Sequence, residues 1–251
     1  NTHPIEVEVH HPEQISEIFD AISYDKGASV LRMLMSYIGP KSFQNGLSYY
    51  LKKHSYKNTE SVHLWEAFEE ISGKPVKRFM AKWISNSGYP IISLEEPKIG
   101  KLIFSQKRFV LGSKNQKSKH GLTDKTIWQI PLQFELNKGE LSDLELFAQV
   151  KKQISITNKA KYVKANPQET GFYRTLYTPS LLAKLYDPVK NKELSVIDRF
   201  GIIRDLSAMS IAGIISSSVF LDFIKAYQDE DSYIIWAEIL SGMKVIYNLL
   251  D

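Results

Sequence analysis

The chain has 251 residues, of which 43% are hydrophobic, with a net charge of +4 and no cysteine. This length predicts one or two globular domains with a large core. The absence of cysteine excludes disulfides and thiolate metal sites and favours a cytoplasmic protein. No apolar run reaches the roughly 18 residues of a membrane span, so we expect no membrane partner.

Residues 12–87 have the apolar spacing of amphipathic helices. The first predicted helical face contains Val30, Leu31, Leu34, Met35 and Ile38. Thr59 or Ser61 is expected to cap a later helix of this part. The sequence Gly-Tyr-Pro at residues 88–90 is expected to end the helical part.

From residue 91 to about 178 the pattern changes to short runs rich in Ile, Val, Phe and Leu, separated by turn residues. The clearest runs are residues 102–104, 126–136, 144–150 and 154–156. Residues 137–139, Asn-Lys-Gly, predict a hairpin turn. Several short strands at regular spacing indicate a small β-sandwich.

Helical spacing returns at Pro179, a residue that suits a first helical turn. A late helix is predicted to bury one apolar face, made of Trp236, Leu240, Met243, Tyr247 and Leu250. Helix pairs of this kind are typical of stacked α-solenoids. Because no third layer follows, we expect this region to be truncated and both chain ends to be cuts.

A basic stretch contains Lys98, Lys101, Lys107, Arg108, Lys114, Lys117, Lys119 and Lys125, with Asp124 as its single acid. A nucleic-acid patch is one interpretation, and it would predict strongly salt-dependent binding. We favour a solvated hairpin, because residues 112–121 have loop composition and no interleaved aromatic side chains. We therefore expect no nucleic-acid partner.

The histidines have no convincing metal-ligand spacing. His10 and His11 are adjacent, and His54 and His63 lie on different predicted segments. His63 and Glu66 form H-x-x-E without a second histidine at ligand distance. We expect no metal-binding and no cofactor-binding residue in this chain. The four tryptophans are expected in the core, namely Trp65, Trp83, Trp128 and Trp236.

The segment from residue 20 to residue 29 reads D-A-I-S-Y-D-K-G-A-S and places Tyr24 at the mouth of a helix. A phenol there can donate its O–H to a negative charge that develops in a cleft. Taken alone, Tyr24 is better explained as a packed aromatic at a helix start. Gly27 is expected to permit close helix packing or access to the cleft.

Several blocks occur in the order found in one enzyme family. They are residues 2–5 (T-H-P-I), 19–20, 23–34, 54–59, 64–65, Trp83 with 88–90, 106–109, 128–132, 166–167 with 171–174, and 198–199. In these blocks the chain resembles zinc-dependent aminopeptidases of the aminopeptidase N, puromycin-sensitive and tricorn-interacting type. The resemblance runs the length of the chain.

The resemblance implies an α+β multidomain fold. Residues 1–90 would be the helical end of a thermolysin-like catalytic domain, residues 91–178 a β-sandwich, and residues 179–251 the truncated beginning of a helical C-terminal domain. The zinc motif H-E-x-x-H and the segment G-x-M-E-N, which holds the substrate's amino group in that family, are both absent. Tyr24 alone carries over as a catalytic residue.

The resemblance also implies a function, that of a metalloprotease and hydrolase that removes N-terminal amino acids from peptides. In the intact parent enzyme, zinc would activate a water and polarise the scissile carbonyl, and Tyr24 would share the oxyanion. Peptides would be its substrates, with the N-terminal and zinc-bearing segments as the missing partners. We expect the chain alone to be inactive. The alternative function is a non-catalytic interaction module that docks onto a partner or a larger protease.

Overall fold

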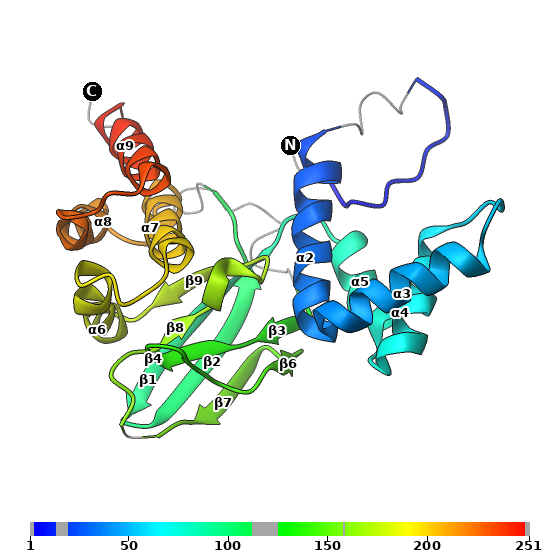
Figure 1. The fold of residues 1–251 in the computed structure, drawn as a ribbon. Coiled ribbons are helices and arrows are strands. Elements are labelled where there is room, and N and C mark those ends of the chain that lie inside the picture. Colours follow the sequence, from blue (N-terminus) through cyan, green and yellow to red (C-terminus); the bar gives the residue numbers. More distant parts are fainter. Residues whose placement is uncertain (1–2, 14–19, 112–124, 158, 249–251) are drawn as a thin grey trace. The chain divides into compact units, whose positions relative to one another are not determined.

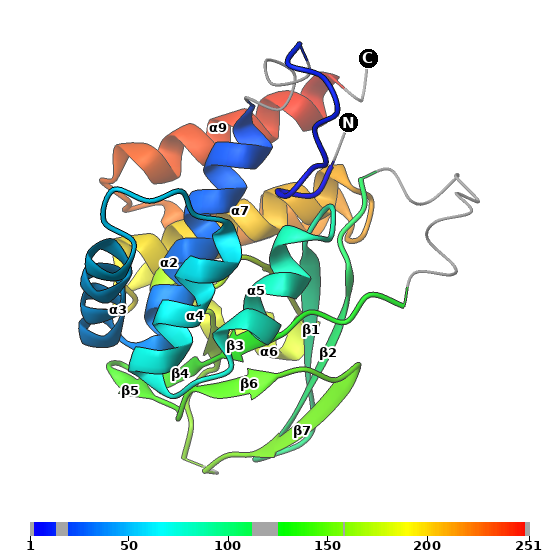
Figure 2. The ribbon, with the colours of Figure 1, turned by 90° about the vertical axis from the view of Figure 1, so that its right-hand side faces the viewer.

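The computed structural model describes residues 3–13, 20–111, 125–157 and 159–248. It contains two compact units, each of which can be followed in two views (Figures 1 and 2). Unit 1 comprises residues 1–88, 128–131 and 170–172, and unit 2 comprises residues 89–127, 132–169 and 173–251. The domain bounds expected at residues 90 and 178 stay a prediction.

Unit 1 is helical. Its elements are the π-helical turn η1 (Ile22–Lys26), α2 (Gly27–Ile38), α3 (Pro40–Lys53), α4 (Ser61–Ser72) and α5 (Val76–Ile84). Helices α3 and α4 pack side by side, α4 packs on α5, and α2 contacts both α3 and α5 (Figure 2). The buried side chains at the centre include Leu34, Phe68, Phe79 and Trp83.

The ends of these helices follow from local chemistry. Helix α2 stops at Gly39, whose φ of +92° a residue with a Cβ rarely adopts, and Pro40 then occupies the first position of α3. The expected cap of α4 was wrong. The N-cap is Glu60, whose side chain accepts the His63 backbone N–H, while the Glu60 backbone N–H donates to the ring of His63 at 3.0 Å.

The strands occupy residues 90–177, as the change of apolar period predicted. They are β1 (Pro90–Lys98), β2 (Lys101–Arg108), β3 (Ile130–Leu132), β4 (Phe134–Asn137), β5 (Glu140–Leu141), β6 (Glu145–Phe147), β7 (Lys151–Ser155), β8 (Lys164–Ala165) and β9 (Arg174–Tyr177). The predicted hairpin turn is confirmed, since β4 and β5 pair antiparallel around Gly139. The predicted loop at residues 112–121 lies outside the described residues.

Unit 2 contains a four-stranded sheet in the order β7-β2-β1-β9 and a three-stranded sheet in the order β5-β4-β8. Strand β1 is antiparallel to β2 and parallel to β9. The buried rings of Phe104 on β2 and Phe134 on β4 stack with centroids 5.5 Å apart, which brings the two sheets into contact.

Helices return after the strands, as predicted. They are α6 (Pro179–Lys190), α7 (Val196–Ile211), α8 (Ser217–Phe223) and α9 (Tyr233–Asn248), with 3-10 turns at Pro167–Glu169 and Ile224–Tyr227. Pro179 begins α6, and α7 packs against α8, α9 and β9 (Figure 1). No helix in the described ranges is long and apolar enough to cross a membrane.

The predicted buried face of the last helix was wrong. Helix α9 buries Ile235, Ile239, Gly242 and Ile246. Leu240, Met243 and Tyr247 are exposed, Trp236, which was expected in the core, is only half-buried, and Leu250 lies outside the described residues. Both faces are apolar, but Gly242 lets α9 approach Ser207 and Phe220, because a Cβ at Gly242 would lie 2.6 Å from the Ser207 Oγ. Trp65, Trp83 and Trp128 are buried as expected.

A buried ionic cluster joins β8 and the turn after it to α7. The Lys164 ammonium donates to the Glu169 carboxylate at 2.8 Å and lies 3.4 Å from the Asp198 carboxylate. Arg204 donates to the other Glu169 oxygen at 2.7 Å. The side chains of Lys164, Glu169 and Asp198 are almost fully buried, so this cluster is a structural element of unit 2.

Candidate functional site

Tyr24 lies in the turn η1, which leads directly into α2. The Tyr24 backbone N–H donates to the Asp20 carbonyl at 3.1 Å, and the Gly27 backbone N–H donates to the Tyr24 carbonyl. The residue is 55% exposed. An exposed tyrosine at a helix start can present its O–H to a substrate, which a tyrosine packed in the core cannot do. The exposure therefore argues against the interpretation of Tyr24 as a packed aromatic.

Asp20 holds the beginning of this turn. Its Oδ1 accepts hydrogen bonds from the backbone N–H groups of Ile22 at 3.0 Å and Ser23 at 2.9 Å. This is the action of an N-cap residue, and aspartate is among the best residues for it. Together with the bond from Tyr24 to the Asp20 carbonyl, three consecutive N–H groups end on this one residue.

The other carboxylate oxygen of Asp20 is held by His3, whose Nε2 lies 2.8 Å away. The His3 Nδ1 lies 2.6 Å from the Pro4 carbonyl oxygen. The hydrogen bonds to Asp20 and then to Pro4 raise the pKa of His3 above its ordinary value. The backbone N–H of Ser23 and then His3 lower the pKa of Asp20. Both shifts favour a charged pair.

The far end of the turn is fixed by Lys26. The side chain is buried, and its ammonium donates to the Asn86 carbonyl at 2.6 Å. This bond ties the turn to the segment that follows α5. Gly27 is not required for close helix packing, because a Cβ at this position would meet no atom within 4 Å. Its role in access to a cleft stays a prediction.

Two histidines that the sequence placed apart come together in unit 1. The rings of His54 and His63 have centroids 5.1 Å apart. Partial burial and then the neighbouring His63 lower the pKa of His54. The His63 Nδ1 accepts the Glu60 N–H and is therefore committed to capping α4. Across the ranges that the structure describes, no group of three or more His, Asp or Glu side chains is arranged to hold a metal ion.

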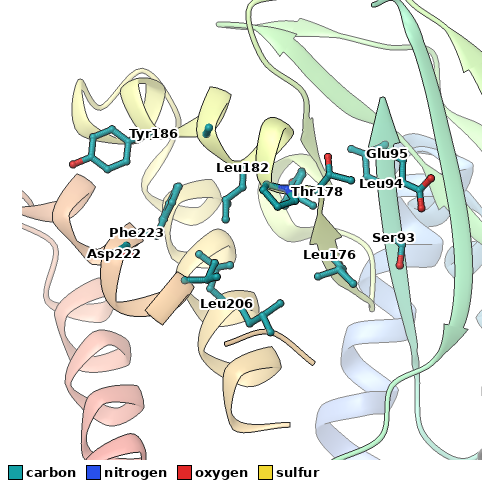
Figure 3. Close-up of a pocket in the computed structure, with 15 residues that line it drawn as sticks. Ser93, Leu94, Glu95, Leu176, Thr178, Leu182, Tyr186, Leu206, Asp222 and Phe223 are labelled. Atoms are coloured by element: carbon teal, nitrogen blue, oxygen red, sulfur yellow. The ribbon is translucent and has the colours of Figure 1, made fainter. Parts of the chain in front are cut away.

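Unit 2 contains an apolar cavity of about 610 Å³, lined by residues of β1, β9, α6, α7 and α8 (Figure 3). Leu182, Leu206 and Phe223 are among its apolar lining residues, and the exposed residues Glu95 and Asp222 also line it. No lysine or arginine is among those residues. The cavity holds none of the groups around Tyr24.

The sequence identified Tyr24 but assigned no role to His3, Asp20 or Lys26. A signal for Asp20 was present, because an aspartate just before an apolar helical run is a typical N-cap. His3 and Lys26 could not be recognised in this way. Their partners are 17 and 60 residues away along the chain.

Comparison with known proteins gives two family matches. Residues 1–83 match the peptidase family M1 domain, and residues 162–251 match the ERAP1-like C-terminal domain. The chain is 38% identical to aminopeptidase M1-D of Oryza sativa subsp. japonica, over 96% of the chain and 28% of the relative. It is 38% identical to aminopeptidase 2 of Candida albicans, over 96% of the chain and 25% of the relative.

A third relative is the tricorn protease-interacting factor F2 of Thermoplasma acidophilum, which is 39% identical over 99% of the chain and 29% of the relative. The chain thus spans between 25% and 29% of the length of these three relatives. Tyr24 and the three residues that hold its turn all lie inside the first matched range.

Proposed function

The chain belongs to peptidase family M1, and we propose that it forms part of an enzyme that removes N-terminal amino acids from peptides. In that enzyme Tyr24 donates its O–H to the oxyanion of the tetrahedral intermediate. The observation that carries the proposal is the placement of Tyr24, which is exposed on a turn fixed by Asp20 at one end and Lys26 at the other.

A fixed donor is what this chemistry requires. The carbonyl oxygen of a peptide bond gains negative charge as the tetrahedral intermediate forms, and a donor already aimed at that position stabilises the charge without reorganisation. Such a donor contributes to turnover only if its backbone is held in place. The hydrogen bonds around residues 20–27 supply this restraint to Tyr24.

Zinc supplies Lewis-acid chemistry in this family. The described residues of this chain do not offer a set of ligands for it, and the sequence has no H-E-x-x-H motif. We therefore propose that the zinc ligands and the general base of the whole enzyme lie on residues other than those of this chain.

We predict that this chain, purified alone, binds no stoichiometric zinc and hydrolyses no aminoacyl substrate. The physical reason is that the described residues offer no ligand set and that the sequence lacks the H-E-x-x-H motif, which supplies the family's general base. The measurement is metal content by mass spectrometry together with an aminoacyl reporter assay. One zinc per chain, lost on substitution of one of the chain's own histidines, would contradict the proposal.

The prediction for Tyr24 concerns the whole enzyme. Tyr24→Phe removes the O–H and keeps the ring, so we expect kcat to fall by roughly 10²–10³, or about 3–4 kcal/mol of transition-state stabilisation. KM should change little, because an interaction made only in the transition state lowers kcat and kcat/KM together. The measurement is steady-state kinetics on an aminoacyl reporter.

A matched control is Tyr49→Phe. Tyr49 lies on α3, and its O–H donates to the Glu70 carboxylate at 2.9 Å on the surface of unit 1. This variant also loses one phenol O–H, but it should retain full turnover. If Tyr24→Phe retained activity within about twofold of wild type, far from the loss expected for an oxyanion donor, the catalytic assignment would be wrong.

The finer fold assignment is also a proposal. We assign residues 1–90 to the helical end of a thermolysin-like catalytic domain, residues 91–178 to a β-sandwich and residues 179–251 to the start of a helical solenoid. The contact between Phe104 and Phe134 supports a sandwich, because it joins the faces of two sheets. The packing of α9 on α7 supports layered helices.

The second candidate function is a non-catalytic interaction module, and the apolar cavity of unit 2 is the observation that favours it. The Tyr24→Phe experiment separates the two functions, because an interaction module predicts no loss of turnover from this substitution. A cytoplasmic location, suggested by the absence of cysteine, is likewise part of the proposal.

A further inference from the structure

The hydrogen-bond partners of His3 favour its charged form. Its Nε2 faces the Asp20 carboxylate and its Nδ1 faces the Pro4 carbonyl, and both partners are acceptors. A neutral imidazole has one donor nitrogen and one acceptor nitrogen, so it can satisfy only one of these contacts. The imidazolium form donates to both. His3 and Asp20 therefore form a charge-assisted pair that is only partly exposed.

We infer that Asp20 and His3 are positioning residues for Tyr24: His3 holds the Asp20 carboxylate, and that carboxylate fixes the backbone of the turn that carries the tyrosine. This inference rests on the proposed function of Tyr24. Neither residue touches the reacting atoms. Each acts through the hydrogen bonds that end on Asp20.

The geometry gives the two Asp20 oxygens separate tasks. Oδ1 caps the N–H groups of Ile22 and Ser23, and Oδ2 is held by His3. Without His3, the carboxylate can rotate about its Cβ–Cγ bond, and the cap is no longer held in one orientation. A π-helical turn is a rare backbone form, and the first N–H groups of this one donate to Asp20. A displacement of Tyr24 by about 1 Å is enough to cost roughly 10²-fold in rate.

The pair also predicts a pH dependence. The charged groups that act on His3 are Asp20, which favours the imidazolium, and Lys26, which opposes it. Because the pKa of His3 is raised above 6.5 and that of Asp20 is lowered, the ion pair is complete at pH values just below 6.5 and is lost as the pH rises through the raised pKa of His3. Loss of the proton removes the positive charge and leaves one ring nitrogen, an acceptor, facing an oxygen that is also an acceptor. Turnover should therefore decline on the alkaline side.

The test applies the aminoacyl reporter assay to the full-length enzyme, with three variants of the pair and one control variant. Asp20→Ala removes the cap, and we expect kcat to fall by about 10–100-fold with KM little changed. Asp20→Asn keeps one oxygen acceptor for the two N–H groups and offers an amide N–H to neutral His3. It should retain kcat close to wild type and lose the alkaline decline. His3→Gln should lose less kcat than Asp20→Ala and should also lose the alkaline decline.

The matched control is His10→Gln. His10 and Glu8 form a similar but exposed pair on the same segment, with 3.7 Å between the Nε2 and the carboxylate oxygen. This variant should keep both the turnover and the alkaline decline of wild type. Thermal midpoints of all variants separate a change of stability from a change of kcat.

Double variants with Tyr24→Phe complete the test. If Asp20 acts through the Tyr24 O–H, Asp20→Ala should cost almost nothing further in the Tyr24→Phe background. An equal loss in both backgrounds, or an Asp20→Asn variant as slow as Asp20→Ala, would overturn the inference. If Tyr24→Phe itself retained turnover, the proposed function would fail instead. If Tyr24→Phe lost turnover while Asp20→Ala did not, only the positioning inference would fail.

Discussion

Lys164→Met tests how much of the stability of unit 2 depends on its buried ionic cluster. The Lys164 ammonium donates to the carbonyl oxygens of Ala165 at 2.7 Å and Asn166 at 3.1 Å. It also contacts the carboxylates of Glu169 and Asp198. The side chain is only 2% exposed. Methionine has a similar length and no charge, so the substitution removes these four interactions and little volume.

The expected cost follows from what remains after the substitution. Glu169 keeps Arg204 at 2.7 Å, and Asp198 keeps the Gln168 backbone N–H at 2.7 Å. Removing one partner of a buried pair costs about 3–5 kcal/mol. Because both carboxylates keep a partner, we expect the lower end, about 3 kcal/mol. For a domain of this size that corresponds to a fall in melting temperature of roughly 6–12 °C.

The assay is thermal and urea unfolding of this chain, followed by tryptophan fluorescence and circular dichroism. Lys225→Met is the matched control, because Lys225 pairs with Asp222 at 2.8 Å on the surface, where both side chains are at least 70% exposed. Exposed pairs contribute little to stability, so this variant should unfold like wild type. Adding Glu169→Gln to Lys164→Met should recover part of the loss, because it removes one of the two buried negative charges that Lys164 no longer balances. A Lys164→Met chain as stable as wild type would refute the reasoning.

Two further substitutions probe the C-terminal helices. Gly242→Ala should lower stability, because the new Cβ would lie 2.6 Å from the Ser207 Oγ and 2.7 Å from the Phe220 ring. Overpacking costs about 1–3 kcal/mol and the better helix propensity of alanine returns about 1 kcal/mol, so we expect a net loss of up to about 2 kcal/mol. Urea unfolding measures this loss. For Glu230, burial raises the pKa, but the hydrogen bonds from Arg199 and the backbone lower it by more, so that the pKa lies below its ordinary value of 4.5. Its contribution is therefore present above pH 4.5 and lost as the pH falls through the lowered pKa. At pH values below 4.5, the urea midpoint of wild type should decrease with falling pH more steeply than the midpoint of Glu230→Gln. An equal dependence on pH in the two proteins would contradict the assignment.

The order of helices, strands and helices could be predicted from the sequence, because the apolar period depends on neighbours close along the chain. The change at residue 90, the hairpin turn before Glu140 and the start of α6 at Pro179 are all local signals of this kind. Tyr24 could also be found from its own segment and the family resemblance, since the residues that mark it are contiguous.

The restraints on Tyr24 required the tertiary structure. His3 approaches Asp20, and Lys26 reaches the Asn86 carbonyl, only after the chain has folded back on itself. Neither pairing has a sequence period, because each joins a side chain to a group far along the chain. Glu60 as the cap of α4 was missed for a different, local reason: Glu60 takes the role expected of Thr59 or Ser61, and its backbone N–H donates to the ring of His63 in the same first turn.

The sequence by itself determined which residues are apolar and with what period, and therefore that residues 233–248 form a helix. It did not determine which side of that helix is buried, because α9 has two apolar faces. The tertiary structure decides in favour of the face with Gly242, where the absence of a side chain lets the helix approach Ser207 and Phe220. The same holds for Lys164, a charged residue expected at the surface, which is buried because the two carboxylates that neutralise it come from the 3-10 turn Pro167–Glu169 and from α7.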